Sequence, residues 1–486
     1  DNRFEGNRMA SSFVNGDAGT GVLKSPLFRI ERRYVNFLIG GGVDYQREYV
    51  ALWIDGKEVK RSTGYNRRVM EYESWDVAEY MGKNARIVLV DQSKEGWGFI
   101  NADCFYQSDT KLEKEIFAKR MLVTHRYLNI PVKMGAVIEQ MDIWIGDKMV
   151  RNMEVELGGD EPDYWVTLEV KDWIGQELRI EASKSPNVEQ ALNQCFCSET
   201  PKEENLFYKE PLRPKVHFTS RRGWLNDPNG LVWHEGEWHL FYQHNPGGNE
   251  WGPMYWGHAI SKDMINWDHK PIALEPDDLG MIFSGSTVVD WNDTSGFFDG
   301  GEGLVAIYTQ NGEGQKQSIA YSKDKGRSWE KYDGNPVIPV DPEIKDFRDP
   351  KVFWHEGTEK WVMSLAAGKK VMFYDSPNLI DWNFMSEFGE GAGAQGGVWE
   401  CPDLFELPVD GDSDDTKWVL QVDIGDGAIA GGSGAQYFIG DFDGTTFKSI
   451  DEPDHINWLD YGADFYAGQS FSDIPDEDGR RIMIAW

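Results

Sequence analysis

The amino-acid sequence predicts an all-β chain in which two β-sandwich modules precede a five-bladed β-propeller, whose fifth blade is cut short by the end of the chain. Short runs of alternating apolar and polar residues recur between Gly, Asp and Asn turns, as at 86–91, 303–310 and 417–423. This period of two is typical of half-buried strands, and long helical periodicity is absent. Two internal repeats then indicate how the strands are grouped.

The first repeat lies in the N-terminal 200 residues. Residues 52–57 (LWIDGK) resemble residues 143–148 (IWIGDK). Val77 is matched 93 residues later by Val170, and three further positions after Val77 repeat at the same spacing. Such a duplication predicts two successive β-sandwich modules. Their Trp-rich faces either bind sugar or pack against protein, and packing is the preferred interpretation.

The second repeat follows a polar, Pro-containing linker. The motifs at 261–263, 322–324 and 376–378 each precede a tryptophan, and these tryptophans are 62 and then 53 residues apart. This spacing is that of four-stranded propeller blades. Blades begin near Asn226, Phe283, Arg348, Glu400 and Asp464. The predicted domains are a first module at 1–110, a second module at 111–200, a linker at 201–214 and the propeller at 215–486.

Bulk properties narrow the function. The formal net charge of −33 disfavours nucleic acid and acidic polysaccharides and favours a neutral substrate. The nine histidines and four cysteines match no metal-binding spacing, so we expect neither a catalytic metal nor a cofactor. No apolar run approaches the length of a membrane span, and we expect a signal peptide to be absent or already removed. Abundant Trp, Tyr and Phe suit sugar faces.

The blade beginnings carry the polar residues that suggest chemistry. Each beginning places a polar motif immediately before an apolar strand, and equivalent slots on successive blades converge on one axis. We therefore expect one funnel to be lined by Asp227, Ser284, Asp349, Glu400 and Asp464. Three of the motifs are distinctive: WLNDPNG at 224–230, FRDP at 347–350 and WECPD at 399–403.

Clustered carboxylates push one another's pKa values apart, so that one ionises easily while another stays protonated near neutral pH. That difference supplies the nucleophile and the acid of glycoside hydrolysis, whose oxocarbenium-like transition state is stabilised by nearby negative charge. Arg348, next to Asp349, can keep that carboxylate ionised and bond a sugar hydroxyl.

These three motifs carry a resemblance to glycoside hydrolase family 32, the β-fructosidases of invertase, inulinase and levanase type, over about residues 207–486. Segments 242–243, 251–258 and 283–286 support it. The resemblance implies retention through a covalent fructosyl-enzyme, with Asp227 as nucleophile, Glu400 as acid/base and Asp349 as transition-state stabiliser. By the same matching, the fructosyl ring is held by Asn226, Gln243, Trp251, Ser284 and Arg348, and the pocket is walled by Phe283 and Trp251. Weaker candidates are Asp464, Tyr466 and Trp486.

Two departures from the family pattern bear on the substrate. The family usually carries a β-sandwich after the propeller, whereas this sequence ends at Trp486. Residues 1–200 resemble the extra N-terminal modules of some bacterial fructan hydrolases, which favours a polymer-acting enzyme. We therefore expect a secreted, periplasmic or cell-surface fructan β-fructosidase that acts in exo mode on inulin, levan or sucrose. Endo action and an invertase remain the alternatives within the family.

Four interpretations outside this one stay open. A sialidase-like propeller is suggested by the Asp-box pattern at 322–329, but no repeat-aligned arginine cluster accompanies it. An inverting arabinan-type hydrolase would also show three carboxylates, and carboxyl groups about 6.5–9.5 Å apart rather than about 5–5.5 Å would identify it. We expect the shorter separation for Asp227 and Glu400. A non-catalytic fructan-binding protein and a transfructosylase complete the alternatives.

Overall fold

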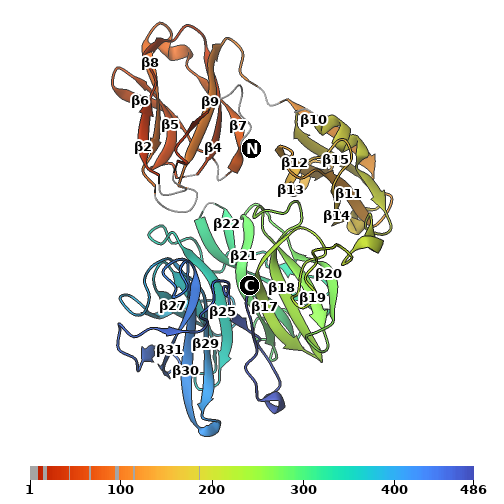
Figure 1. Cartoon of the computed structure of the whole chain (residues 1–486), viewed down its shortest axis with the longest axis vertical. Coiled ribbons are helices and arrows are strands. Elements are labelled where there is room, and N and C mark those ends of the chain that lie inside the picture. The colour runs from red at the N-terminus through yellow and green to blue at the C-terminus, as the bar shows by residue number, and fades with distance from the viewer. Residues whose placement is uncertain are drawn as a thin grey trace. The chain divides into compact units, whose positions relative to one another are not determined.

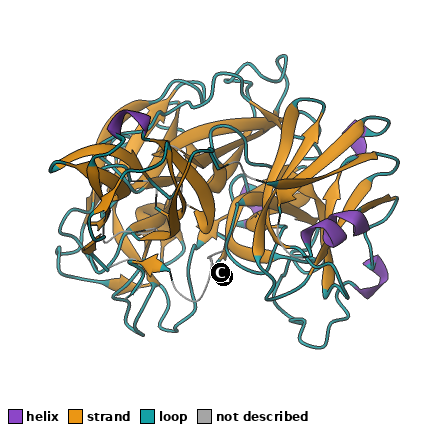
Figure 2. Ribbon diagram, turned by 90° about the horizontal axis from the view of Figure 1, so that it is seen from above, coloured by secondary structure: helices purple, strands orange, loops and turns teal. Residues whose placement is uncertain are grey.

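A computed structural model describes residues 9–14, 19–42, 44–64, 67–93, 98–112, 115–184, 187–312 and 314–486. The chain divides into two compact units, Asp1–Glu203 and Glu204–Trp486. Strands dominate both units (Figure 2), which confirms the all-β prediction. Within the described residues, no helix has the length and apolar character needed to cross a membrane. The helices described are α1 (Val188–Gln194) and the 3-10 turns η1 (Ala78–Tyr80), η2 (Lys171–Trp173), η3 (Glu204–Leu206) and η4 (Asp476–Asp478).

The strands up to residue 108 form two antiparallel sheets that share one core. Side chains of both sheets, Phe37, Leu52 and Trp75 among them, pack into a single buried cluster. The first sheet runs β1 (Ala10–Ser11), β9 (Ile100–Ser108), β4 (Tyr34–Gly41) and β7 (Arg67–Asp76). The second runs β2 (Gly21–Lys24), β8 (Asn84–Asp91), β5 (Glu48–Ile54) and β6 (Lys57–Ser62), with β3 (Phe28–Arg29) paired to β8.

The next strands repeat this pairing. One sheet runs β10 (Ile116–Leu122), β15 (Glu177–Ser183), β12 (Ile138–Ile145) and β13 (Lys148–Glu156), and the other runs β14 (Tyr164–Glu169), β11 (Tyr127–Val132) and β16 (Phe196–Ser198). Strands β12, β13 and β15 pair as β5, β6 and β8 do, and η2 begins 93 residues after η1. The duplication seen in the sequence is therefore a duplication of strand pairing.

Most strands of the second unit form four successive antiparallel sheets, three of four strands and one of five, and in each sheet four strands run in chain order (Figure 1). The first comprises β17 (Trp224–His234), β18 (Glu237–Asn245), β19 (Tyr255–Ser261) and β20 (Trp267–Leu274), and the second β21 (Met281–Asp290), β22 (Gly303–Gly312), β23 (Gly314–Ser322) and β24 (Glu330–Lys331). The third comprises β25 (Phe347–His355), β26 (Lys360–Ala367), β27 (Val371–Ser376) and β28 (Asn383–Phe388). The fourth comprises β29 (Trp399–Val409), β30 (Asp412–Ile424), β31 (Gly434–Phe442) and β32 (Phe447–Ser449), with β33 (Asn457–Trp458) paired to β31.

The repeated motif before each tryptophan is a turn between the third and fourth strands. Ser261, Ser322 and Ser376 end the third strands, and their hydroxyls bond the acceptor two residues on at 3.0, 2.8 and 3.2 Å. Side-chain hydrogen bonds of this kind stabilise tight turns. The motif is thus structural, as is typical of hairpins that carry an Asp-box.

The first strands of the four sheets lie next to one another. Strand β17 contacts β21, β21 contacts β25, and β25 contacts β29. A short pair, β34 (Gln469–Ser470) with β35 (Met483–Ile484), follows, and β34 contacts both β29 and β17. Ser472 also forms a parallel bridge to Val232 on β17. The segment around β34 therefore lies between the first and the fourth sheets.

The four first strands share one irregularity, which holds the polar motifs. Their pairing with the second strands shifts register between Leu225 and Pro228, Ile282 and Gly285, Arg348 and Lys351, and Glu400 and Asp403. We expected the motifs immediately before the strands, and that placement was wrong because each motif lies inside its strand, at a β-bulge. A bulge releases residues from the hydrogen-bond ladder, which suits proline, since it has no N–H to donate.

Candidate active site

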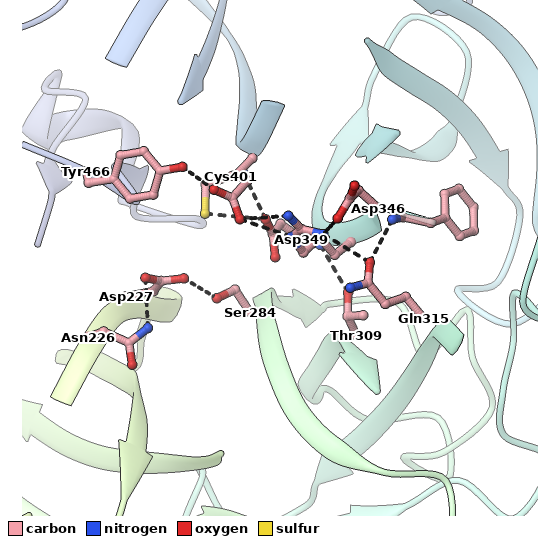
Figure 3. A network of polar contacts seen from close by, with 12 residues as sticks. Asn226, Asp227, Ser284, Thr309, Gln315, Asp346, Asp349, Cys401 and Tyr466 are labelled. Carbon is pink, nitrogen blue, oxygen red and sulfur yellow. Dashed lines mark hydrogen bonds and ion pairs between the residues drawn. The ribbon is translucent and has the colours of Figure 1, made fainter. Parts of the chain in front are cut away.

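Asp227 lies in the bulge of β17, half-buried and supported by two side-chain donors. The Ser284 hydroxyl, from the equivalent bulge of β21, donates to Oδ2 at 2.6 Å, and the Asn226 amide donates to Oδ1 at 3.0 Å (Figure 3). The Trp224 indole N–H bonds Asn226 Oδ1 at 2.7 Å, which orients that amide. Both carboxylate oxygens are therefore fixed, and a fixed geometry is what a nucleophile requires.

Asp349 occupies the bulge of β25 and is only 3 % exposed. Its backbone adopts a φ of 65°, an uncommon conformation for a non-glycine residue. The Cys401 backbone N–H donates to Oδ2 at 3.0 Å, and the Asp349 N–H donates to the Thr309 hydroxyl at 3.0 Å. The strained backbone is thus held from two neighbouring sheets.

Glu400, on β29, accepts hydrogen bonds at both of its carboxylate oxygens. Arg348 donates to Oε1 from Nε at 3.0 Å and from Nη2 at 2.9 Å, and the Tyr466 hydroxyl contacts Oε2. Arg348 Nη1 also donates to Asp346 at 2.6 Å, and Gln315 accepts from the same nitrogen at 3.3 Å. Figure 3 shows this network converging with Asp227 and Asp349 on one region.

The carboxyl groups of Asp227, Asp349 and Glu400 interact electrostatically. Burial raises the pKa of Asp227, Glu400 raises it further, and the Ser284 and Asn226 donors oppose the rise. Burial also raises the pKa of Asp349, to about 7, with Arg348 opposing and Glu400 and Asp227 adding to the rise. Burial lowers the pKa of Arg348, but Glu400, Asp346 and Asp349 outweigh it and hold that pKa above its usual value. A cluster of this kind is typical of acid/base sites.

The raised pKa of Asp349 has a stability consequence that can be measured. Its pKa is about 7 in the folded protein, against 3.8 for an unperturbed aspartic acid. The contribution of this group to the free energy of unfolding is therefore fully present below about pH 4 and is lost as pH rises from there through 7. Asp349→Asn removes this titration. We expect the variant to unfold at higher temperature than the wild type at pH 8, by the equivalent of about 1–4 kcal/mol, with the gap closing toward pH 4.

The control for that experiment is Asp268→Asn, at a carboxylate that is 69 % exposed on the outer strand β20. The difference in thermal stability between this variant and the wild type should not depend on pH in this way. If Asp349→Asn differs from the wild type in stability by the same amount at pH 4 and pH 8, the raised pKa of Asp349 is contradicted.

The other predicted substrate residues surround the same region. Phe283 shares the β21 bulge with Ser284, and Trp251 meets Phe283 edge-on with ring centroids 6.0 Å apart. Gln243 lies on β18 opposite the β17 bulge and is 2 % exposed. Its side-chain nitrogen has no hydrogen-bond partner among the described residues. Such a buried, unsatisfied donor is what a polar ligand would satisfy.

The last blade beginning differs from the prediction in detail. Asp464 is exposed, and the side chain that contacts Glu400 is Tyr466, two residues later. Trp486 exchanges both backbone hydrogen bonds with Tyr466, and its half-exposed ring lies 6.4 Å from that of Trp224. Roles for Asp464 and Trp486 therefore stay predictions.

Several polar residues of this region were not foreseen. Thr309, Gln315, Asp346 and Cys401 all contact the trio or Arg348. Asp423, on β30, is fully buried directly across the ladder from Glu400. Cys401 lies inside the WECPD motif and Asp346 directly precedes the FRDP motif, whereas Thr309, Gln315 and Asp423 are found only once the strand pairing is known.

Comparison with known proteins identifies the relatives of this unit. The sequence model described as "Glycosyl hydrolases family 32 N-terminal domain" matches residues 217–486, more than half of the chain. A levanase of Bacillus subtilis (strain 168) is 61% identical over 285 residues, which are 58% of this chain and 42% of that protein. An extracellular exo-inulinase of Aspergillus niger is 46% identical over 314 residues, covering 57% of this chain and 58% of that one.

Solved structures give the same grouping. The crystal structure of exo-inulinase from Aspergillus awamori superposes with a TM-score of 0.54 at 44% identity, covering 57% of this chain and 60% of that one. The β-fructofuranosidase of Schwanniomyces occidentalis complexed with fructosyl-erythritol follows with a TM-score of 0.51 at 45% identity, covering 54% and 52%. The chain spans about half the length of these relatives.

Proposed function

Because this chain belongs to glycosyl hydrolase family 32, we propose that it is a retaining β-fructosidase that releases fructose from β-fructans or sucrose. The observation that carries the proposal is the convergence of Asp227, Asp349 and Glu400, each from the first strand of a different sheet, on one region (Figure 3), where Arg348 hydrogen-bonds Glu400. Relatives named levanase, exo-inulinase and invertase support the substrate class.

In the first half of the reaction, Asp227 attacks C2 of the terminal fructosyl unit. The bond from C2 to the leaving oxygen breaks as Glu400 gives that oxygen its proton, and a fructosyl ester of Asp227 forms. The donors from Ser284 and Asn226 fix the attacking carboxylate in position. In its ionised form, the neighbouring Asp349 stabilises the positive charge that develops on the ring.

In the second half, Glu400 accepts a proton from water, and the oxygen of that water attacks C2. The ester bond to Asp227 breaks, fructose leaves, and Glu400 is again protonated. Two displacements at C2 retain the anomeric configuration. Arg348, which holds Glu400 and Asp346 in this structure, keeps the acid/base in place and offers a donor to sugar hydroxyls.

Arg348→Lys tests whether activity depends on the paired N–H groups of this guanidinium as well as on its positive charge. A lysine keeps the charge but cannot place two N–H groups on Glu400 Oε1, as Arg348 does at 3.0 and 2.9 Å. We expect kcat/KM on sucrose to fall by about 10²-fold, because one charge-assisted hydrogen bond is lost. A near-normal kcat/KM would show that charge alone suffices.

We propose the following architecture for this function. The four sheets and the β34–β35 pair are blades of a five-bladed propeller at 215–486, whose axis carries the bulges. Residues 1–110 and 111–200 are two β-sandwich modules, and 201–214 is a linker. The neighbouring first strands, and the contact of β34 with both β29 and β17, support a closed ring. The duplicated strand pairing supports the two modules.

The substrate is proposed to be a fructan attacked from its end, by an enzyme outside the cytoplasm. Relatives named extracellular exo-inulinase support both points. The N-terminal modules are proposed chiefly as packing modules, with a sugar contact as the alternative.

A product profile tests the proposed function. The chain is incubated with inulin, levan and sucrose, and the products are resolved by chromatography. Fructose as the sole early product of the polymers is the expected result, and the faster polymer identifies the preferred linkage. Mixed oligosaccharides would overturn the exo mode, and no product from any of the three would overturn the β-fructosidase assignment.

A further inference from the structure

The β25 bulge takes Asp349 out of the hydrogen-bond ladder of its own sheet, and the second sheet supplies the acceptor that its N–H needs. The pairing of β25 with β26 shifts register between Arg348 and Lys351, and a bulged residue has no ladder partner. The Asp349 N–H donates instead to the Thr309 hydroxyl of β22 at 3.0 Å (Figure 3). Because a buried N–H without an acceptor is costly, Thr309 takes the place of a ladder partner.

Thr309 belongs to a chain of hydrogen bonds that returns to the same motif. Its hydroxyl accepts from the Asp349 N–H and donates to Gln317 Oε1 at 2.6 Å. The Gln317 amide then donates to the Phe347 carbonyl at 2.8 Å. Thr309 and Gln317 face each other across the β22–β23 ladder, and both side chains are fully buried. Since each group in the chain has a single role as donor or acceptor, the orientation of both side chains is determined.

A third side chain of the second sheet also bonds this motif. Gln315, on β23, accepts from the Phe347 N–H at 2.7 Å. Side chains of β22 and β23 therefore hold the motif backbone on both sides of Arg348, at Phe347 and at Asp349. Asp349 has a φ of 65°, and such a backbone persists only where its surroundings over-determine it. The direction in which the Asp349 side chain leaves the backbone is thus set from the neighbouring sheet.

We propose that Thr309 and Gln317 are positioning residues for the transition-state stabiliser: they fix the backbone from Phe347 to Asp349 and so hold the Asp349 carboxylate in the active site. This inference rests on the proposed function, since it concerns what Asp349 does during turnover. Neither residue needs to contact the sugar, because both side chains are fully buried and bond to each other and to the motif.

Thr309→Val tests the inference with little change in side-chain shape. Valine has no hydroxyl, so the Asp349 N–H loses its acceptor and Gln317 Oε1 loses its donor. A displaced carboxylate stabilises the charge on the ring less well, and we expect kcat on sucrose to fall by about 10–10²-fold. This interaction gains strength in the transition state, so kcat should fall by a larger factor than KM rises. Thr309→Ser keeps the hydroxyl and should restore kcat to near the wild-type value.

Thr287→Val is the matched control. Thr287 is equally buried on β21 of the same sheet, and its hydroxyl has no hydrogen-bond partner among the described residues. The same replacement at this position should leave kcat unchanged. The thermal unfolding midpoint of every variant is measured, and the assays are run well below the lowest of them, so that loss of folded protein does not lower kcat.

A double-mutant cycle determines whether Thr309 acts through Asp349. Asp349→Asn keeps the nucleophile and the acid/base, and its slow turnover is followed at high enzyme concentration. In this background Thr309→Val should change kcat by less than about twofold, because the group that Thr309 positions is already lost.

Gln317→Met interrupts the chain of hydrogen bonds at its other end. The Thr309 hydroxyl still accepts from the Asp349 N–H in this variant, so kcat should fall less than in Thr309→Val. The two changes together should lower kcat no further than Thr309→Val alone, since both act on the same chain. If Thr309→Val does not fold, Gln317→Met replaces it in the cycle with Asp349→Asn.

Three results would overturn the inference. In the first, Thr309→Val turns over sucrose at the wild-type kcat. In the second, Thr309→Ser loses as much activity as Thr309→Val, so the hydroxyl is not what matters. In the third, Thr309→Val lowers kcat by the same factor with and without Asp349→Asn, which marks a structural residue that acts independently of Asp349. Failure of the proposed function is distinguishable, because the wild-type protein would then release no fructose from sucrose.

Discussion

Asp227→Asn should abolish turnover while the protein stays folded. The amide cannot attack C2, so no fructosyl-enzyme forms, and we expect kcat on sucrose to fall by at least about 10⁴-fold. The fold should tolerate the change, because Ser284 can still donate to an amide oxygen at the position it now serves at 2.6 Å. The measurement is the initial rate of fructose release, together with the thermal unfolding midpoint.

The matched control is Asp268→Asn, the same replacement on the outer strand of the same sheet, at a carboxylate that pairs with Lys270. It should retain wild-type activity. Substantial residual turnover in Asp227→Asn, above any trace of wild-type contaminant, would mean that another group is the nucleophile.

Glu400→Gln should separate substrates by their leaving groups. The leaving groups of sucrose and fructans are poor alkoxides and need a proton, so we expect kcat/KM to fall by about 10²–10⁴-fold. An activated fructosyl donor needs little protonation and should lose far less in its first step. The glutamine oxygen can still accept from Arg348, whose Nη2 now lies 2.9 Å from Glu400 Oε1, so the site should keep its shape.

Glu406→Gln serves as its control, since this residue lies on the same strand with its side chain exposed. Its activity on both substrate classes should match the wild type. Equal losses of Glu400→Gln on sucrose and on the activated donor would remove Glu400 from the role of acid.

The sequence revealed features that depend on local pattern. Alternating apolar runs predicted strands, and Ser322 with Asp324 predicted a turn that the structure confirms. The resemblance to family 32 was confirmed by the match over residues 217–486. The 93-residue repeat corresponds to repeated strand pairing. Each of these features rests on neighbouring residues, so periodicity and spacing were sufficient to predict it.

Features that depend on register were not accessible in this way. The sequence placed Asp349 and Glu400 in equivalent slots, but their bulges align Glu400 with Arg348, and Asp349 with Cys401. That one-residue offset sets Arg348 and Glu400 within hydrogen-bonding distance, at 2.9 Å. Asp423 stands in an ordinary strand pattern, and only its pairing with Glu400 sets it apart. The sequence motifs therefore identify the first strand of each sheet. Residues of the second strands that lie beside the site can be identified only from the strand pairing.

The most direct test of the central claim is the anomeric configuration of the first fructose released. Sucrose is hydrolysed at high enzyme concentration, and the product is observed by NMR before mutarotation mixes the anomers. Attack by Asp227 followed by water assisted by Glu400 predicts that β-fructose appears first, because two inversions at C2 restore the configuration. If α-fructose appears first, a single displacement has taken place, and the covalent fructosyl-enzyme on Asp227 is contradicted.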